Sequence, residues 1–243
     1  MDFAYQEYIK MSRMPTTWCS GCGLGIIFKH IALVFHKLGF NKKNTVVVSG
    51  IGCSGRTAGF FSLDTVHGLH GRALPLAEAV KAVNPGLKVV VVSGDGDILG
   101  IGGNHLIHTA RRNADITVIC VNNRIYGMTG GQKSPTTEVG TETLTSPEGN
   151  MDYPFDPQHL LRGFGCFYAR STTFHLKLME KSITEALSRT GFSFVEIMSQ
   201  CTTNDGRRRG YTDGYSMLEY FKNRYKIKRE EGPLSPDEIG ILR

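Results

Sequence analysis

Short apolar runs rich in Val and Ile alternate along the chain with segments whose apolar positions follow a helical period. Four buried strands are predicted, at Thr45–Ser49, Leu87–Ser93, Ile116–Val121 and Phe194–Met198. Helices are predicted between them, at Gly21–Leu38, Leu74–Val83, Leu99–Arg112 and Phe174–Thr190. Apolar strands that are separated by helices and do not alternate with polar positions are typical of a parallel sheet. We therefore expect an α/β fold with helices covering both faces of the sheet.

Two segments depart from this alternation. Gly127–Asp156 is polar, contains six threonines and is too long for a plain connection, so it is expected to be functional and to close over a substrate. The tail from about residue 212 has aromatic and basic residues at helical spacing, and either covers the domain or packs on a partner. Because there is no internal repeat and no low-complexity linker, residues 1–243 are predicted to form a single domain with an extended C-terminal tail.

The composition restricts the class of protein. The chain has 243 residues, of which 40% are hydrophobic, and no apolar run reaches the roughly 18 residues of a membrane span. The N-terminal stretch MDFAYQEYIKMSRMP has acids and no apolar core, so no signal peptide is expected and the default location is cytoplasmic. The net charge of +6 suits an acidic protein partner or coenzyme phosphates. No nucleic-acid motif accompanies it, so nucleic acid is not expected as a partner.

Polar residues follow two neighbouring predicted strands where each strand ends. Gly94-Asp95-Gly96-Asp97 follows the second strand, and Asn122-Asn123-Arg124-Ile125 follows the third, about 25 to 30 residues further on. The carboxyl ends of parallel strands meet at one edge, where ligands bind. Glycines allow phosphate oxygens to approach the backbone, and carboxylate and amide oxygens suit Mg²⁺. This pattern predicts a magnesium diphosphate site, with a helix starting near Gly100 aimed at the diphosphate.

Two alternatives to a magnesium diphosphate site remain open. The segments could simply be tight turns after buried strands. The spacing Gly94-x-Gly96-x-x-x-Gly100 also imitates a Rossmann fingerprint. A dinucleotide site needs an acid at the end of the following strand, where this chain has Asn122-Asn123, so the Rossmann interpretation is disfavoured.

The chain has six cysteines, and four of them fall near the same predicted edge. Cys19 and Cys22 form a Cys-x-x-Cys that opens a helix, Cys53 lies in a glycine-rich turn after a strand, and Cys201 follows another strand. The remaining two are assigned to packing: Cys120 in a buried strand and Cys166 at the start of a short one. Four thiolates suit a [4Fe–4S] cluster or structural zinc, and their spacing alone does not decide between the two.

Taken together, these motifs resemble the β subunit of the 2-oxoacid:ferredoxin oxidoreductases. The resemblance is dense from about Trp18 to Thr137 and returns at Cys201. The segments that carry it are Trp18-Cys19-Ser20-Gly21-Cys22-Gly23, Gly50–Arg56, His67-Gly68-Leu69-His70-Gly71-Arg72-Ala73, Gly94–Asp97 and Asn122–Gln132. It implies a thiamine diphosphate-binding fold, with the cofactor contacted by Ser54, Gly94, Gly96, Asp97, Gly127, Met128 and Thr129. It further implies a [4Fe–4S] cluster on Cys19, Cys22, Cys53 and Cys201. Mg²⁺ would be held by Asp95, by the Asn123 side chain and by the Ile125 carbonyl.

The resemblance also implies the reaction and the partners. The expected activity is coenzyme A-dependent oxidative decarboxylation of a 2-oxoacid, with electrons passing through the cluster to ferredoxin. The family's cofactor-activating glutamate lies on an α subunit, so an obligate α partner is expected, and further small subunits are possible. Glu78-Ala79 departs from the Thr-Gly that family members tend to have near this point.

Three positions bear on the substrate. Met128 precedes Thr129-Gly130, where the pyruvate-type enzymes have asparagine, and this favours a 2-oxoglutarate type. Branched-chain, broad-range and pyruvate oxidoreductases remain alternatives, as does a non-redox thiamine enzyme with structural zinc. Arg56 and His67 are candidate substrate contacts. Arg56 could hold a substrate carboxylate or a coenzyme A phosphate, or be a plain surface residue. His67 and His70 flank Gly68, and both are predicted to touch the diphosphate or the substrate; the alternative is that they cap a loop.

Overall fold

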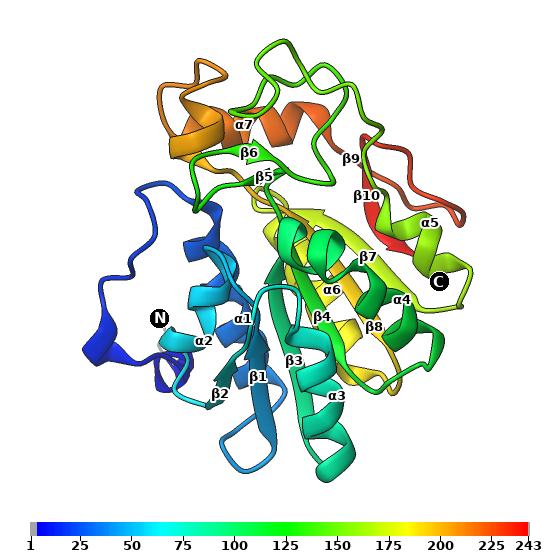
Figure 1. Ribbon diagram of the computed structural model, residues 1–243. Coiled ribbons are helices and arrows are strands. Elements are labelled where there is room, and N and C mark those ends of the chain that lie inside the picture. Colours follow the sequence, from blue (N-terminus) through cyan, green and yellow to red (C-terminus); the bar gives the residue numbers. More distant parts are fainter. Residues whose placement is uncertain (1–3, 243) are drawn as a thin grey trace.

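The central element is one large twisted sheet with helices on both faces (Figure 1). The structure is a computed structural model that describes residues 4–242. Met1–Phe3 and Arg243 lie outside the described residues. All four belong to the domain predicted from the sequence, and Met1–Phe3 belong also to the N-terminal stretch in which no signal peptide is expected. None of the helices in residues 4–242 combines the length and the apolar character needed to cross a membrane.

The sheet has eight strands in the order β2-β1-β3-β4-β8-β7-β10-β9. They are β1 (Thr45–Ser49), β2 (Asp64–His67), β3 (Lys88–Gly94), β4 (Thr117–Asn122), β7 (Phe167–Thr172), β8 (Ser193–Met198), β9 (Lys226–Ile227) and β10 (Glu238–Leu242). Strands β2 to β7 in this order pair in parallel, and β10 pairs antiparallel with β7. A separate antiparallel hairpin joins β5 (Ile125–Tyr126) and β6 (Gln132–Lys133).

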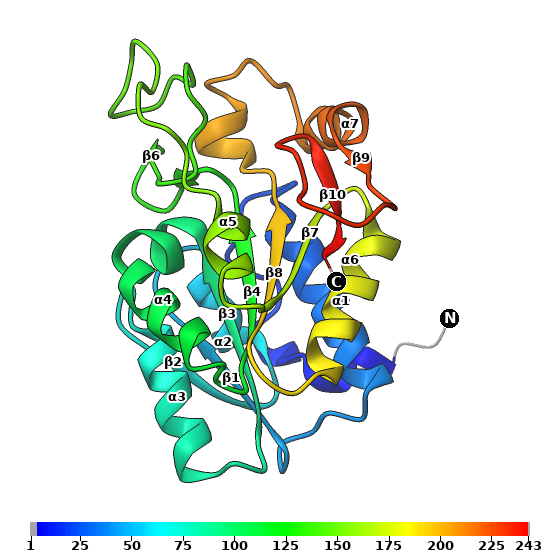
Figure 2. The ribbon, with the colours of Figure 1, turned by 90° about the vertical axis from the view of Figure 1, so that its right-hand side faces the viewer.

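In residues 4–242, seven α-helices surround the sheet. They are α1 (Gly23–Lys37), α2 (Thr57–Phe60), α3 (Ala73–Val83), α4 (Gly103–Arg111), α5 (Pro157–Arg162), α6 (Leu176–Ser188) and α7 (Gly214–Arg224). Helices α1 and α6 lie on one face of the sheet, and α3 and α4 lie on the other (Figure 2). Successive valines of β3 enter opposite cores, because Val90 and Val92 pack with α1 whereas Val89 and Val91 pack with α3 and α4. This two-sided burial explains why the strands are apolar without alternation.

The helix predicted after the Gly-Asp-Gly segment differs from its expected form. It opens with a π-helical turn at Gly96–Ile101 and resumes as α4 after Gly102. Gly102 allows this close joint, because a Cβ there would lie 2.7 Å from the carbonyl oxygen of Asp97. The helical backbone therefore starts directly after Asp95, and not near Gly100 as predicted. Such π-turns occur often at functional sites.

The C-terminal tail packs on the molecule's own sheet. Short helical turns precede α1, at η1 (Ala4–Tyr8) and η2 (Met11–Arg13), and follow strands β1, β3 and β8, at η3 (Ser54–Arg56), η4 (Gly96–Ile101) and η5 (Thr202–Gly206). In the tail, Phe221 and Tyr225 of α7 form a small core with Met198 and Ile239. Strand β10 then extends the sheet beyond β7. The tail therefore packs on the domain within residues 4–242, and packing on a partner stays a prediction.

Candidate cofactor site

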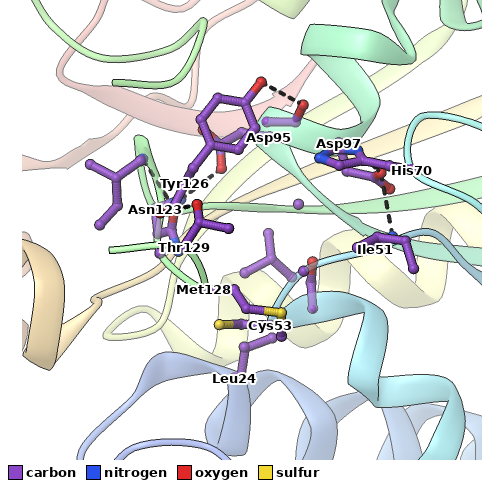
Figure 3. Close-up of a pocket in the computed structure, with 17 residues that line it drawn as sticks. Leu24, Ile51, Cys53, His70, Asp95, Asp97, Asn123, Tyr126, Met128 and Thr129 are labelled. Atoms are coloured by element: carbon purple, nitrogen blue, oxygen red, sulfur yellow. Dashed lines mark hydrogen bonds and ion pairs between the residues drawn. The ribbon is translucent and has the colours of Figure 1, made fainter. Parts of the chain in front are cut away.

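A cavity opens at the carboxyl edge of β1, β3 and β4, where the predicted Gly-Asp-Gly and Asn-Asn segments meet (Figure 3). We call it the diphosphate cavity. Its lining residues are Leu24, Ile51, Gly52, Cys53, Ser54, His70, Gly94, Asp95, Gly96, Asp97, Val121, Asn123, Ile125, Tyr126, Gly127, Met128 and Thr129. The structure thus brings together all ten residues that were predicted to contact the metal or the cofactor. They are Ser54, Gly94–Asp97, Asn123, Ile125 and Gly127–Thr129.

Asp95 is a buried carboxylate with no cation beside it among residues 4–242. Its side chain is 2% exposed and forms no ion pair with a described residue. Burial raises its pKa, although hydrogen bonds from Ser134, Thr136 and the Asn123 amide oppose this effect. A buried carboxylate that lacks a positive partner is costly, and a bound divalent cation would offset that cost.

The hydroxyls that support Asp95 come from the long polar loop. Ser134 and Thr136 donate to its Oδ2 at 2.6 and 2.7 Å, and both residues are buried. Thr137 donates to the carbonyl of Arg124 at 2.6 Å and fixes the same segment to the end of β4. This part of the loop is therefore held against Asp95 and the end of β4, behind the residues that line the cavity. Ser134 and Thr136 were not singled out from the sequence, since only the polar composition of the loop pointed to them.

The Asn-Asn segment reverses the chain into the β5–β6 hairpin. Arg124 adopts φ = 63°, and the Asn123 Oδ1 accepts a hydrogen bond from the Ile125 amide at 3.2 Å. This turn brings the Asn123 amide to 3.4 Å from the Asp95 Oδ1 and places Ile125 on the cavity wall. Left-handed backbone at a residue other than glycine costs roughly 1–3 kcal/mol and tends to mark functional sites.

Tyr126 explains why Gly96 must be glycine. A Cβ on Gly96 would lie 2.4 Å from the tyrosine ring, and the Tyr126 hydroxyl donates to the Gly96 carbonyl at 3.0 Å. Gly94 is constrained in a similar way, because a Cβ there would lie 2.9 Å from the Ser54 Oγ. The two glycines are therefore required for close packing around the cavity, which the sequence pattern did not reveal.

Asp97 braces the cavity wall opposite Asn123. Its carboxylate accepts hydrogen bonds from the Gly71 amide at 2.6 Å and from Ser93, and its Oδ1 lies 2.6 Å from the Nδ1 of His70. It thereby ties β3 to the loop after β2. His70 lines the cavity, whereas His67 stands at the end of β2 and is not among the lining residues.

A buried polar network extends from Asp95 into the sheet. The Thr136 hydroxyl also contacts the Asn122 Oδ1 at 2.9 Å, and the Asn122 amide donates to Glu196 at 2.8 Å. Glu196 forms an ion pair with Arg170 at 2.6 Å. Burial alone would raise the pKa of Glu196, but the charge of Arg170 and the surrounding hydrogen bonds lower it. The network fixes the end of β4, from which Asn123 extends.

The four cysteines assigned to one group line a second cavity, which we call the cysteine cavity. Cys19, Cys22, Cys53 and Cys201 are all among its lining residues, and its volume is about 180 Å³. No three acid, cysteine or histidine side chains in the described part of the chain converge closely enough to bind a single metal ion.

The thiols of the cysteine cavity lie near the charge of Arg56, which opposes the effect of burial on the pKa of Cys53, but burial dominates and that pKa is raised. Burial is the main reason that the pKa of Cys22 is raised to about 12, and the other three cysteines contribute to this rise. A bound cationic metal would favour the thiolate form of these groups. Arg56 lines this cavity and not the diphosphate cavity.

The two remaining cysteines lie elsewhere. Cys120 is fully buried in β4, and the Cys166 thiol lies 3.7 Å from the Ala110 carbonyl oxygen. Both positions agree with the packing roles expected from the sequence.

The comparisons with known proteins agree with this geometry. Residues 45–197 match the family described as "Thiamine pyrophosphate enzyme, C-terminal TPP binding domain". The chain belongs to this family of thiamine diphosphate enzymes and, within it, to the β subunits of the 2-oxoacid:ferredoxin oxidoreductases.

The chain is similar to two curated proteins and to one solved structure of this family. The chain is 44% identical to 2-oxoglutarate synthase subunit KorB of Archaeoglobus fulgidus, over 100% of this chain and 90% of that one. It is 38% identical to the 2-oxoacid:ferredoxin oxidoreductase subunit beta of Saccharolobus solfataricus, over 88% of this chain and 68% of that one. A solved 2-oxoglutarate:ferredoxin oxidoreductase from Magnetococcus marinus, with 2-oxoglutarate, coenzyme A and succinyl-CoA bound, superposes with a TM-score of 0.87 at 30% identity. That match covers 98% of this chain and 84% of the solved one.

Proposed function

We propose that this chain binds magnesium thiamine diphosphate and a [4Fe–4S] cluster, and that with an α subunit it oxidises 2-oxoglutarate in a coenzyme A-dependent reaction. The observation that carries the proposal is that the diphosphate cavity and the cysteine cavity adjoin. They share the lining residues Leu24, Cys53, Asn123, Gly127 and Met128. An electron source and an electron acceptor would then be neighbours within one chain.

The residues of the diphosphate cavity fit the metal. Asp95 would supply a carboxylate oxygen, Asn123 a side-chain oxygen and Ile125 a backbone carbonyl oxygen, and such oxygens are the ligands that Mg²⁺ prefers. The hydroxyls of Ser134 and Thr136 hold the Asp95 carboxylate in place. Thiamine diphosphate, when bound, supplies the electron sink for decarboxylation.

The other residues of this cavity orient the cofactor and exclude water. The backbone of Gly94 and Gly96 leaves room for phosphate oxygens, and Ser54 offers a hydroxyl. Met128 and Thr129 lie at the tip of the hairpin and are themselves exposed, so they would border the reacting end of the cofactor.

The cysteine cavity fits a cluster better than zinc. Zinc would draw four sulfurs to about 2.3 Å from a single point. The four cysteines instead line a cavity of about 180 Å³, which leaves room for a group larger than one ion. We therefore propose Cys19, Cys22, Cys53 and Cys201 as ligands of a [4Fe–4S] cluster, and we do not favour a non-redox enzyme with structural zinc.

The substrate assignment rests on two observations. Met128 supplies an apolar side chain where the pyruvate-type enzymes have asparagine, and it lines both cavities. Relatives covering most of this chain are named as 2-oxoglutarate enzymes. We propose 2-oxoglutarate, with branched-chain, broad-range and pyruvate activities as the alternatives that a substrate screen separates. Arg56 stays a predicted substrate contact, from its place on the cysteine cavity. The sequence also predicted His67, but His70 of the same motif lines the diphosphate cavity, and it is the histidine that we propose to contact the substrate.

An α subunit and ferredoxin complete the proposal. The diphosphate cavity contains two carboxylates, Asp95 and Asp97, and both are engaged by protein hydrogen bonds. We propose that the acid which activates the cofactor comes from the α subunit, that residues 1–243 act as a single domain, and that electrons leave to ferredoxin. The cytoplasmic location stays a prediction.

Anaerobic co-expression of this chain with its α subunit tests the proposal. The complex should reduce a viologen dye only when a 2-oxoacid and coenzyme A are both present, with 2-oxoglutarate preferred over pyruvate and branched-chain 2-oxoacids. The isolated β chain, loaded with both cofactors, should show no turnover. Robust turnover by the isolated chain, or a colourless complex without iron, would overturn it.

A further inference from the structure

Two arginines in the turn that follows Cys201 have no acidic partner. Arg207 and Arg208 are exposed, and neither forms an ion pair with any acid in residues 4–242. The neighbouring Arg209 is used internally. Its Nη1 lies 3.4 Å from the Asp205 Oδ2, and its guanidinium lies 4.8 Å from the centre of the Tyr220 ring. Of the three consecutive arginines, two are therefore free to meet a partner.

The turn that carries this arginine pair is rigidly connected to Cys201. The Gly206 amide donates to the Cys201 carbonyl at 2.8 Å, and the Tyr211 amide donates to the Gly206 carbonyl at 2.9 Å. The single helical turn η5 thus separates Cys201 from Arg207. The side chains of Arg207 and Arg208 are long and flexible, but these hydrogen bonds hold their backbone in a defined position relative to the cysteine cavity.

The same surface includes the first cysteine pair. Thr202 donates to the Ser20 carbonyl at 2.9 Å, and Gln200 donates to the Gly21 carbonyl at 3.1 Å. Cys19 is exposed, so the cysteine cavity reaches the surface beside this turn. Figure 1 shows the orange segment after β8 lying next to the blue segment that precedes α1.

We propose that Arg207 and Arg208 form part of the docking surface for an acidic ferredoxin that accepts electrons from the cysteine site. This inference rests on the proposed function. The transfer moves one electron from the reduced cluster to oxidised ferredoxin, and it breaks or forms no bond and moves no proton. Electron-transfer encounters use small interfaces, so a few exposed charges beside the donor have a large effect on them. Opposite charge raises the association rate and orients the partner.

A charge-reversal pair with a matched control tests the surface. The test variant is Arg207→Glu/Arg208→Glu, and the control is Lys42→Glu/Lys43→Glu. The two lysines are also adjacent, exposed and without an ion pair among the described residues. They precede β1 and so lie at the amino end of that strand, whereas the two cavities lie at the carboxyl ends of the strands. Both variants are made in the complete αβ complex. The dissociation constant of a recombinant acidic two-cluster ferredoxin is measured by calorimetry, together with KM values for ferredoxin, coenzyme A and methyl viologen.

The arginine variant should bind ferredoxin about tenfold or more weakly at low ionic strength, and high salt should shrink the difference. Its iron content and viologen reduction should stay within about twofold of wild type, and the lysine control should bind ferredoxin normally. Unchanged ferredoxin binding, or an equal loss in the control, would contradict the docking surface. A raised KM for coenzyme A alone, or loss of the α subunit, would reassign the arginines to coenzyme phosphates or to assembly. Wild-type complex that lacks iron or viologen reduction would defeat the proposed function itself, independently of the arginines.

Discussion

The Nδ1 of His70 lies 2.6 Å from the Oδ1 of Asp97, and this contact places the imidazole on the wall of the diphosphate cavity. His67, three residues earlier, belongs to β2 and stays outside the lining. The two histidines of the same sequence motif therefore occupy different surroundings. Only one of them is positioned to meet a ligand held near Asp95.

The two histidines provide a matched pair of variants. We expect His70→Asn to lower kcat/KM for the 2-oxoacid by about tenfold to a hundredfold, because it removes a polar group at the cavity wall. His67→Asn should change kcat/KM by less than about threefold. Steady-state kinetics of both complexes decide this, and a larger loss for His67→Asn would restore the role that its sequence motif suggests.

Asp95→Ala should abolish binding of magnesium thiamine diphosphate while the cluster stays in place. The variant removes the buried carboxylate that the cation would neutralise. Cofactor stoichiometry and iron content of the purified complex measure the two effects separately. Asp64→Ala, which removes an exposed carboxylate of β2, is the control and should keep both cofactors. Normal cofactor stoichiometry in Asp95→Ala would refute the metal assignment.

Thr136→Val should weaken Mg²⁺ binding and destabilise the fold by about 1–3 kcal/mol. The change keeps the side-chain shape but removes the hydroxyl that lies 2.7 Å from the Asp95 Oδ2 and 2.9 Å from the Asn122 Oδ1, so the buried oxygen to which it donates loses a hydrogen bond. Thr143→Val is a control in the same loop, since the buried Thr143 hydroxyl has no hydrogen-bond partner in the described structure. Mg²⁺ titration and urea unfolding should show a loss only for Thr136→Val. Equal behaviour of the two variants would remove Thr136 from the site.

The Glu196–Arg170 pair predicts how stability depends on pH. The pKa of Glu196 is lowered in the folded chain, so its contribution is present above the unfolded value of about 4.3 and is lost as pH falls through the folded value. Urea midpoints of the wild type should therefore fall as the pH is lowered from about 5 to 3. Glu196→Gln cannot titrate and leaves Arg170 underpaired, so it should be less stable at pH 7 and show a shallower fall. Parallel pH curves for the two proteins would contradict this account.

The sequence predicted the parts of the fold that depend on local burial. Strands β1, β3, β4 and β8 are apolar because both faces are covered, and each was located within about one residue. Strand β2 was missed because Asp64–His67 is a short, partly exposed edge strand without an apolar run. Strand β10 was missed because its partner β7 lies about 70 residues earlier, and such pairing leaves no local signal.

In the candidate site, too, residues with a local sequence signal could be predicted and residues that depend on long-range contacts could not. Gly94–Asp97 and Asn122–Ile125 could be found because strand ends in a parallel sheet share an edge. Ser134 and Thr136 could not, because a loop without a periodic pattern does not reveal which hydroxyls fold back onto Asp95. Glu196 looks like an ordinary strand residue until its partners Asn122 and Arg170 are known. Long-range polar contacts depend on the whole tertiary structure.

The central claim is that this chain binds a [4Fe–4S] cluster in the cysteine cavity, next to the diphosphate cavity. The most direct test is the iron and acid-labile sulfide content of six single Cys→Ala variants, purified anaerobically as the complex. The wild type should carry about four iron atoms and four sulfides in the β chain. Replacement of Cys19, Cys22, Cys53 or Cys201 should destroy this cluster, while Cys120→Ala and Cys166→Ala should keep it. A normal iron and sulfide content in any of the first four variants, or zinc in place of iron in the wild type, would contradict the account.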